Sequence, residues 1–429
     1  MARFLYSCLL SVLTPFIVLR MFMRARKAPA YAQRWWQRFG VFKGPKQTNG
    51  KQGGIWFHTV SVGEFIAAIP LIEQTLQAYP DELITITTTT PTGSEQVQKR
   101  FAQKLGKQVF HVYLPYDLPW FLFGFLRKVR PKLLMILETE LWPNLIHCSK
   151  KAGCKVLVVN ARLSEKSAKG YAKVSTLAAQ MLNTLDGLAV QNQTDAQRFT
   201  QLGMPQCAMQ VTGSIKFDLT ISPELLNQGQ ALKHSWGVKR HVLIVASTHK
   251  GEDEVALDGF SALLKQDPEL LMILVPRHPE RFNDVASLVQ QRGLRLSRRS
   301  LLDAHEQTQV LLVDAMGELM AFLAASDVCL MGGSFVENGG HNPLEPAALG
   351  VPVIMGDSQF NFALICQQLQ QAGGLITASP EDWSNIAAQW LEDGQLRQQK
   401  GLAAKGVVEA NRGAKQKVFE WLQQLFEAS

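Results

Sequence analysis

The sequence predicts an α/β protein made of two doubly wound parallel-sheet domains. Short, almost continuously apolar runs alternate with helical patterns along the chain, which is typical of parallel strands covered by helices on both faces. The runs fall into two series, separated by a polar segment between Phe217 and Arg240. A chain of 429 residues is also longer than one ordinary hydrophobic core supports, so two domains are expected.

The first series is assigned to an N-terminal domain of residues 28–220. Its apolar runs predict six strands, at Gly54–Val60, Leu83–Thr89, Val109–Leu114, Leu133–Leu137, Val156–Asn160 and Leu188–Gln191. The patterns between these runs predict helices, for example at Phe65–Tyr79 and Ser94–Leu105.

The second series is assigned to a C-terminal domain of residues 235–429. It predicts five strands, at Val242–Ala246, Leu271–Val275, Val310–Val313, Val328–Met331 and Val351–Met355. A single long amphipathic helix is predicted from about Leu402 to Phe426. The two domains are expected to face a cleft at the carboxyl ends of their strands, where sheets of this kind bind ligands.

The net charge of +8 is concentrated at one end of the chain. Residues 1–50 contain nine basic residues and no acidic one, and the remainder carries 35 basic against 36 acidic residues. No basic stripe interleaved with aromatic residues occurs elsewhere, which argues against a nucleic-acid partner. The six scattered cysteines form no C-x-x-C pair and indicate a reducing compartment.

The longest apolar run, Phe4–Leu19, precedes Arg20 and a basic cluster at 24–27. A cleaved signal peptide, a membrane anchor and a buried core helix are the three alternatives for such a run. A signal peptide carries its basic residues before the apolar run, whereas here the strong cluster follows it. We therefore expect residues 1–27 to be a single-pass anchor that leaves the rest of the chain in the cytoplasm. Trp35 and Trp36 suit a surface that rests against anionic headgroups.

The stretch Gly332–Gly356, GGSFVENGGHNPLEPAALGVPVIMG, follows a predicted strand. Its glycines allow the backbone to approach a ligand closely, and Asn342-Pro343 predicts a helix start. A strand, a glycine-rich loop and a helix N-terminus together offer free N–H groups to an anion. This stretch is therefore predicted to hold a nucleotide or sugar phosphate. Asn342 and Glu345 also fit a helix cap, and the functional alternative is that Glu345 binds ribose hydroxyls.

Glu64 lies in HTVSVGEF, directly after the first predicted strand. Ser61 and Glu64 fit a capping box, but the turn after a first strand also faces the ligand crevice, where a carboxylate can act as general base. Both interpretations stay open at this point. If Glu64 only tied down its own helix, it would not be available as a general base. The neighbouring His58 is expected to be a satisfied core histidine.

Two further segments place charged residues near the crevice of the first domain. Glu138 and Glu140 follow an apolar strand, and alternation predicts that both lie on one face. Because an unpaired buried carboxylate is costly, at least one should point at the cleft or hold a helix start. Lys216, near the domain junction, is either a solvated surface residue or a counter-charge for a substrate carboxylate or phosphate.

The second domain has two comparable segments. Arg277 and His278 end a strand between two prolines and form a candidate anion clamp, with a structural turn as the alternative. Met316, Gly317 and Glu318 also follow a strand, where a glycine turn leaves N–H groups available to a base or phosphate.

Several motifs are absent from the sequence. No G-x-x-x-x-G-K-[ST], G-x-G-x-x-G, G-x-S-x-G or D-x-D occurs, which argues against P-loop hydrolysis and dehydrogenase chemistry. No dedicated metal site is expected. The acidic run 252–254 is expected to be exposed, where it could bind cations loosely.

Taken together, these segments resemble a known family. HTVSVGE, TTTTPTGSE, VYLPYDLP, ETELWPN, NARLS, TGSIKFD, PRHPERF, MGEL and GGHNPLEPAALGVPVIMG closely resemble the 3-deoxy-D-manno-octulosonic acid (Kdo) transferases of Gram-negative bacteria, over almost the whole chain. The resemblance implies a GT-B glycosyltransferase fold, anchored on the cytoplasmic side of the inner membrane. It also implies inverting transfer of Kdo from CMP-Kdo to the lipid A precursor (lipid IVA) in lipopolysaccharide synthesis, with no cofactor besides the donor.

The resemblance also assigns roles to individual residues. Glu64 matches the catalytic base, and Glu138 and Lys216 match positions that stabilise the transition state. The CMP-binding segments match Arg277, His278, Met316, Gly317, Glu318, Asn342, Pro343, Leu344 and Glu345. Two other classes remain open: a GT-B enzyme that uses a different nucleotide sugar, and a membrane-tethered nucleotide-binding protein without catalysis.

Overall fold

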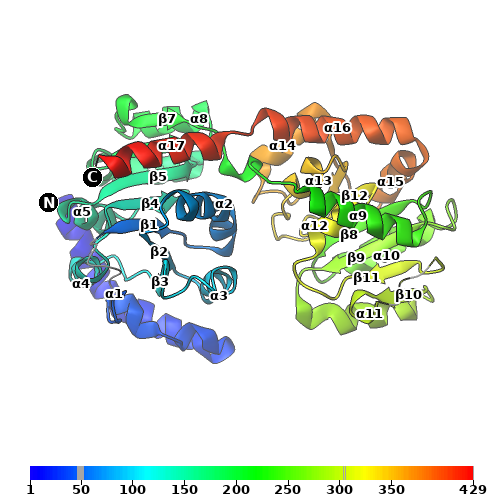
Figure 1. The fold of residues 1–429 in the computed structure, drawn as a ribbon, viewed down its shortest axis with the longest axis horizontal. Helices are drawn as coiled ribbons and strands as arrows, with labels where there is room; N and C mark the ends of the chain where they lie inside the picture. Colours follow the sequence, from blue (N-terminus) through cyan, green and yellow to red (C-terminus); the bar gives the residue numbers. More distant parts are fainter. Residues whose placement is uncertain (46–52, 303, 305, 429) are drawn as a thin grey trace. The chain divides into compact units, whose positions relative to one another are not determined.

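The computed structural model describes residues 1–45, 53–302, 304 and 306–428. The chain forms two compact units. Unit 1 comprises Met1–Asp218 and Arg412–Ser429, and unit 2 comprises Leu219–Asn411. Each unit contains one seven-stranded sheet in which all pairings are parallel, so the predicted α/β class is confirmed (Figure 1).

The sheet of unit 1 has the strand order β3-β2-β1-β4-β5-β6-β7. Its strands are β1 (Gly54–His58), β2 (Leu83–Thr88), β3 (Val109–Tyr113), β4 (Leu133–Leu137), β5 (Lys155–Ala161), β6 (Gly187–Val190) and β7 (Met209–Val211). The six predicted strands are confirmed, with ends shifted by at most two residues. The prediction missed β7, a three-residue edge strand with no buried residue.

Helices cover both faces of this sheet because the side chains of each strand alternate between two cores. Trp56 and Leu134 pack with α4 (Pro119–Val129), α5 (Pro143–Lys151), α7 (Ser175–Leu182) and α8 (Gln193–Gln201). Phe57 and Met135 pack on the other face with α2 (Val62–Ala78), α3 (Pro91–Arg100) and α17 (Ala414–Glu427). The helix predicted at 94–105 in fact starts at Pro91 as α3, because Thr90 caps it and proline suits the first position.

The sheet of unit 2 has the order β10-β11-β9-β8-β12-β13-β14. Its strands are β8 (Val242–Thr248), β9 (Leu271–Pro276), β10 (Leu296–Arg298), β11 (Val310–Leu312), β12 (Val328–Met331), β13 (Val353–Met355) and β14 (Leu375–Thr377). The five predicted strands are present, and the short edge strands β10 and β14 were missed. The helices of unit 2 are α9 (Pro223–Trp236), α10 (Glu252–Leu263), α11 (Phe282–Gln291), α12 (Leu319–Ala324), α13 (Leu344–Ala348), α14 (Ala363–Ala372), α15 (Trp383–Glu392) and α16 (Gly394–Ala410).

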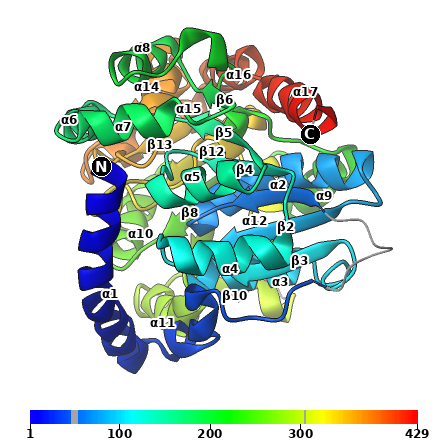
Figure 2. The same ribbon diagram turned by 90° about the vertical axis from the view of Figure 1, so that its left-hand side faces the viewer.

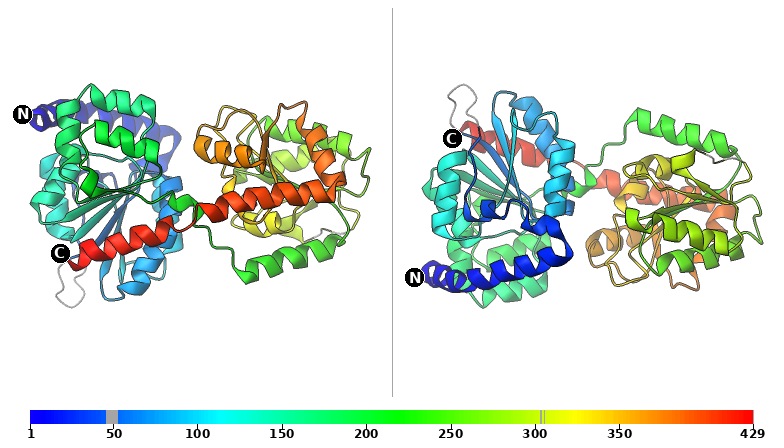
Figure 3. Two further views of the ribbon diagram at one scale, coloured as in Figure 1. Left: turned by 90° about the horizontal axis from the view of Figure 1, so that it is seen from above. Right: turned by 90° about the horizontal axis from the view of Figure 1, so that it is seen from below.

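Two segments connect the units, and the prediction for the second of them is wrong. The polar segment between the two strand series contains α9, which Ser222 caps and which packs against α12 within unit 2. The single C-terminal helix is two helices, because Gly413 has a left-handed backbone (φ 98°) and interrupts it. After this break, α17 packs on α2 and β5, so residues 412–429 belong to unit 1 and not to the second domain (Figure 3).

The N-terminal apolar run forms α1 (Ala2–Lys27), followed by two short 3₁₀ turns, η1 (Pro29–Ala32) and η2 (Trp35–Phe39). Among the described residues, α1 is the one helix long and apolar enough to cross a membrane, and only 11% of its most apolar window is buried. This low burial excludes the alternative of a buried core helix.

Candidate functional site

The candidate catalytic residues of unit 1 lie where the strand order of its sheet reverses. The first strand, β1, lies between β2 and β4, so the chain leaves β1 toward one edge of the sheet and β4 toward the other. The loops after two such strands diverge and leave a crevice at their carboxyl ends, which is the usual ligand site of doubly wound sheets. Glu64 follows β1, and Glu138 follows β4 directly.

The Glu64 carboxylate is held at the start of its own helix. Oε2 accepts a hydrogen bond from the Val60 backbone N–H at 2.8 Å, and Oε1 accepts one from the Ser61 hydroxyl at 2.8 Å. In return, Ser61 Oγ accepts a hydrogen bond from the Glu64 N–H. The predicted capping box is therefore confirmed. Each carboxylate oxygen has a second lone pair, so the cap leaves capacity for another hydrogen bond.

The environment of Glu64 differs from that of an ordinary cap, because the side chain is only 8% exposed. Burial raises the pKa of Glu64 to about 7, against the two hydrogen bonds, which lower it. The charges of Glu138 and Glu140 raise this pKa further. A carboxyl group that titrates near neutral pH suits proton transfer better than an ordinary surface glutamate does.

Glu138 and Lys216 form an ion pair beside this carboxylate. Lys216 Nζ lies 2.7 Å from Glu138 Oε1, and Arg162 Nε lies 3.6 Å from Oε2. Asn160 supports the lysine, because its Oδ1 accepts hydrogen bonds from Ser214 Oγ and the Ile215 N–H, in the turn that carries Lys216. The structure thus brings all three predicted catalytic residues into one cluster.

Backbone strain marks the same region. Glu138 and Asn160 both have left-handed backbones (φ 55° and 56°), a conformation that costs a non-glycine residue about 1–3 kcal/mol. Because the chain turns at Glu138, the prediction that Glu138 and Glu140 share a strand face is wrong. Glu140 instead accepts a hydrogen bond from Trp142 Nε1 at 3.0 Å, and burial raises its pKa.

His58 is only half satisfied, in contrast to the prediction. Its Nδ1 lies 2.9 Å from Thr87 Oγ1, but Nε2 has no partner among the described residues, although the side chain is fully buried. Burial lowers the pKa of His58 to about 4, so the ring is neutral.

The sheet of unit 2 reverses its order between β8 and β12, and the glycine-rich stretch follows β12 at this point. Three N–H groups of this stretch that were expected to be free are instead bound by Glu252. Its carboxylate accepts hydrogen bonds from four N–H groups at 2.7–3.0 Å, those of His249, Gly333, Ser334 and Phe335. The acidic run 252–254 is therefore not an exposed cation site, since Glu252 and Asp253 are buried.

The glycines of this stretch are required by the packing of the loop. A Cβ on Gly332 would lie 2.6 Å from the Ser247 carbonyl oxygen, and one on Gly356 would collide with the Ser334 carbonyl. Gly339 and Gly340 have left-handed backbones. These contacts explain the glycines without a ligand, so the glycines alone do not indicate a phosphate cradle.

Histidines and an arginine gather beside this loop. His249 Nε2 lies 2.8 Å from His341 Nε2 with the two rings stacked, and His278 meets the His249 ring edge-on at 5.2 Å. Burial lowers the pKa of His341 to about 4, and the charge of Arg277 lowers it further. Within the described residues, no group of three or more His, Cys, Asp or Glu is placed to hold a metal ion. Imidazole N–H groups and a guanidinium can bind an anion by hydrogen bonds, so the cluster is suited to an anion.

The other predicted donor-site residues lie in two places. Asn342 Nδ2 donates to Glu345 Oε1 at 3.2 Å, and its Oδ1 accepts from the Leu344 N–H. The helix α13 begins at Leu344 with Pro343 as its N-cap, one residue later than predicted. Burial raises the pKa of Glu345, while the hydrogen bond from Asn342 and the charge of Arg277 lower it. The effect of Arg277 places the Glu345 carboxyl group near the histidine cluster.

The segment Met316–Glu318 has no contact with this cluster among those described. Glu318 is bound by two hydrogen bonds from Arg299, at 2.8 and 3.1 Å. Gly317 and Glu318 line a cavity of about 560 Å³ next to α9, and Met316 is exposed. The electrostatic contact of Glu345 with Arg277 links the 277–278 and 342–345 segments, and the 316–318 segment follows β11, which pairs with β9, the strand directly before Arg277.

Comparison with known proteins identifies the family. Residues 33–219 match the family model described as 3-Deoxy-D-manno-octulosonic-acid transferase (kdotransferase), and residues 295–407 match Glycosyl transferases group 1. The chain is 42% identical to the 3-deoxy-D-manno-octulosonic acid transferase of Haemophilus influenzae, covering 100% of this chain and 99% of the relative. It is 33% identical to that of Bordetella pertussis, covering 99% of each chain. The chain belongs to the 3-deoxy-D-manno-octulosonic acid (Kdo) transferase family.

Solved structures confirm the GT-B-like fold of this Kdo transferase family member. A glycosyltransferase from Rickettsia africae has a TM-score of 0.56 at 13% identity, covering 88% of this chain and all of that one. UDP-GlcNAc 2-epimerase from Neisseria meningitidis has a TM-score of 0.58 at 13% identity, covering 86% and 100%. At this identity the likeness concerns the fold alone, and the family assignment makes the chain a glycosyltransferase.

Three residues of this Kdo transferase family member were missed from the sequence. Glu252 was taken as part of an exposed acidic run, and His249 and His341 drew no prediction. Two signals were available: each histidine follows a strand of the series, and Glu252 lies three residues after His249, as in a capping box. What the sequence could not show is that the loops after β8 and β12 meet.

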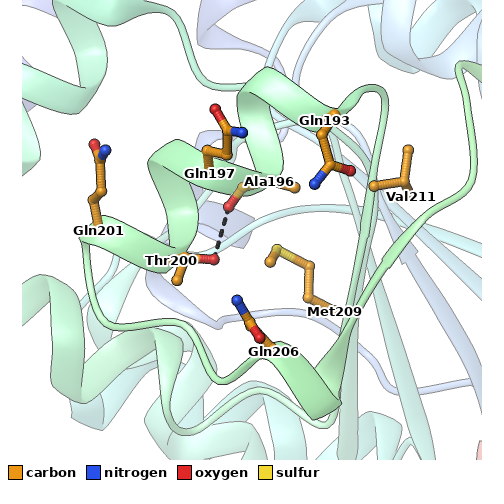
Figure 4. A pocket seen from close by; sticks show the side chains of 8 residues that line it. All are labelled: Gln193, Ala196, Gln197, Thr200, Gln201, Gln206, Met209 and Val211. Carbon is orange, nitrogen blue, oxygen red and sulfur yellow. Dashed lines mark hydrogen bonds between the residues drawn. The ribbon is translucent and has the colours of Figure 1, made fainter.

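A shallow cavity on α8 and β7 is unrelated to these residues (Figure 4). It is lined by Gln193, Ala196, Gln197, Thr200, Gln201, Gln206, Met209 and Val211. None of the predicted catalytic or donor-site residues lines it. Its glutamine-rich wall carries no charged group, so it offers no chemistry for transfer.

Proposed function

We propose that this chain transfers Kdo from CMP-Kdo to a hydroxyl of the lipid A precursor lipid IVA, with inversion at the sugar's anomeric carbon. The observation that carries the proposal is the Glu64 carboxyl group, with a pKa raised to about 7, beside the Glu138–Lys216 pair at the carboxyl ends of β1 and β4. The two relatives named above match this chain over almost their whole length and are Kdo transferases, which supports the choice of sugar.

In the proposed reaction, the acceptor hydroxyl oxygen forms a bond to the anomeric carbon of Kdo. The bond from that carbon to the phosphate oxygen breaks, and its electron pair leaves with CMP. Glu64 takes the proton of the acceptor hydroxyl and later releases it to solvent. Attack from the face opposite the leaving group inverts the centre.

The remaining charged residues balance charge during transfer. Lys216 offsets the negative charge of the Kdo carboxylate or of the departing phosphate, and Glu138 holds the lysine in place. In unit 2, Arg277 and the histidines beside it bind the phosphate of CMP, and the Glu345 carboxylate accepts hydrogen bonds from the ribose hydroxyls. Met316, Gly317 and Glu318 are also proposed to contact the nucleotide, from the loop after β11, the strand that pairs with β9.

The proposed location is the cytoplasmic face of the inner membrane. The apolar helix α1 supplies the attachment, and the basic residues that follow it match anionic lipid headgroups. This location suits an acceptor that is itself a phosphorylated lipid.

The test is a transfer assay with CMP-Kdo and a tetraacylated lipid A precursor, in which mass spectrometry counts the sugars added. The proposal expects Kdo-bearing product, and inhibition by CMP at far lower concentrations than by UDP or GDP. Inhibition by UDP in preference to CMP would indicate a different nucleotide sugar. CMP binding with no transfer to any acceptor would indicate a non-catalytic nucleotide-binding protein.

A further inference from the structure

The helix α1 carries one continuous apolar stripe that the protein does not cover. Its members recur at spacings of four and three residues, so they lie on one face of the helix. Each is between 53% and 67% exposed: Leu5, Leu9, Val12, Phe16, Leu19 and Met23. The stripe runs almost the full length of the helix, and large exposed apolar patches mark interaction surfaces.

The opposite face of α1 is attached to unit 1 near both ends. Near the start, Ser7 Oγ lies 2.9 Å from Asn144 Nδ2, and Arg3 Nη1 donates to Asn144 Oδ1 at 3.0 Å. Near the end, the Tyr116 hydroxyl donates to Met21 Sδ at 3.8 Å, and Met21 is buried. Ser7 and Met21 are roughly 21 Å apart along a helix. The helix therefore lies along unit 1 and does not project from it (Figure 2).

The first of these attachments is built into the fold of unit 1. The Asp117 carboxylate accepts hydrogen bonds from the Asn144 and Leu145 N–H groups, at 3.0 and 2.6 Å, and so caps α5. The Tyr6 side chain of α1 also hydrogen-bonds to Asp117. Asn144 is fully buried beneath α1. If α1 left unit 1, the Asn144 side chain would lose its hydrogen bonds to Arg3 and Ser7.

A spanning orientation conflicts with this docking. If the docked helix stood across a bilayer, the parts of unit 1 beside it would enter the hydrocarbon region as well. These parts include α5 and α7, which expose side chains such as Lys151 and Gln180. Placing such groups in hydrocarbon costs several kcal/mol each.

The surroundings of the stripe match the headgroup region of an anionic bilayer. Arg20, Arg24 and Arg26 are exposed near the end of α1, where no acidic residue occurs in the first fifty positions. Aromatic rings continue from this end onto the body, through the pairs Phe22–Trp35, Trp35–Phe39 and Phe39–Phe121. Exposed tryptophans beside arginines are typical of helices that lie at the membrane interface.

We propose that α1 lies in the plane of the membrane surface, with its apolar stripe in one leaflet of an anionic bilayer and both of its ends on the side of the two units. The inference rests on the proposed membrane location but not on Kdo transfer. It replaces the single pass expected from the apolar run by an in-plane attachment.

The test is a nitroxide scan of the full chain in vesicles of phosphatidylethanolamine and phosphatidylglycerol. Exposed Cys8 and Cys207 are first replaced by serine, and single cysteines are then introduced at 5, 9, 12, 16 and 19, with 11 and 14 as controls on other faces. An in-plane helix gives depths that oscillate with a period of about 3.6 residues, with the five stripe positions equally deep. A single maximum near residue 12 that falls toward both ends would show a spanning helix and overturn the proposal. Immobile labels that neither oxygen nor a water-soluble reagent reaches would indicate a second copy on the stripe, which also overturns it.

A second measurement locates the helix start in sealed membrane vesicles. In a Cys8→Ser background, Ala2→Cys and native Cys207 are labelled with a membrane-impermeant maleimide. The proposal expects both positions to react in the same vesicle orientation, whereas a spanning helix places them on opposite sides. Transfer activity is measured on the same vesicles, so a periodic depth profile without Kdo transfer would refute only the proposed reaction.

Discussion

Lys216 Nζ lies 2.7 Å from Glu138 Oε1, and both side chains are largely buried at the carboxyl end of the sheet of unit 1. An ion pair in such a place has two effects that mutations can separate. It stabilises the strained turn after β4, and in the proposed reaction it keeps a positive charge where the substrate becomes more negative.

We predict that Lys216→Met lowers the free energy of unfolding by about 1–3 kcal/mol, because the Glu138 carboxylate loses its partner. It should also lower kcat by about 10²–10³-fold, as loss of one transition-state donor does. Urea unfolding and transfer kinetics provide the two measurements. The double variant Lys216→Met with Glu138→Gln should regain stability but not activity. Recovery of both would reduce the lysine to a structural role.

Glu64→Gln separates the cap from the proposed base. Glutamine can still cap the helix start, but it cannot take a proton, so we predict a loss of about 10²–10⁴-fold in kcat. Glu64→Ala, which removes the cap as well, is the matched control. Full activity in Glu64→Gln would leave the residue as a cap only.

The stability of the same variant should depend on pH. The folded pKa of Glu64, about 7, lies above its ordinary value of 4.5, so the wild type loses stability as pH rises through this range. At pH 8, Glu64→Gln should therefore be more stable than the wild type by on the order of 2–3 kcal/mol, with most of the difference gone at pH 5. Thermal or urea unfolding at the two pH values checks the sign. A destabilised variant at pH 8 would contradict the raised pKa.

Transfer activity should also depend on the ionisation of Glu64. We predict that kcat/KM falls about tenfold per pH unit below pH 7, since only the ionised carboxylate accepts a proton. A pH profile with CMP-Kdo and the lipid precursor measures the effect. Activity that stays constant from pH 7 down to pH 5 would assign the proton to another group.

Glu252→Gln should disturb the loop after β12. The amide group of glutamine is a donor and would face N–H groups that now share a carboxylate. We expect a loss of about 1–3 kcal/mol in unfolding free energy, because buried N–H groups lose an acceptor, and at least tenfold weaker CMP binding. Glu254→Gln, at an exposed position of the same helix, is the control. Equal behaviour of the two variants would show that the carboxylate does not order the loop.

CMP binding should take up protons at unit 2. The pKa values of His341 and His249 are lowered in the free protein by burial, and a bound phosphate would raise them. Affinity for CMP should therefore increase as pH falls from 8 to 6. Calorimetry in two buffers of different ionisation enthalpy counts the protons, and His341→Asn should remove most of the uptake. His234→Asn, exposed on α9, should leave it unchanged.

The sequence by itself determined the fold class and eleven of the fourteen strands that the structure describes. These predictions succeeded because buried parallel strands are continuous apolar runs. The pairing of Lys216 with Glu138 could not be predicted in this way, because Lys216 follows β7, which lies three strands away from β4 in the sheet. The prediction missed the three short edge strands β7, β10 and β14, since three half-exposed residues do not form a continuous apolar run.

Only the tertiary structure decided which groups neutralise one another. The sequence cannot show that the Glu252 carboxylate accepts hydrogen bonds from N–H groups of the glycine-rich loop, because the partners are about eighty residues apart. It also cannot show that α1 lies along unit 1, because its composition suits a spanning helix equally well. In both cases the contacts join residues far apart in the sequence, which lie close together only after the chain has folded. The energies of such contacts depend on distances between atoms, and a local sequence pattern does not contain these distances.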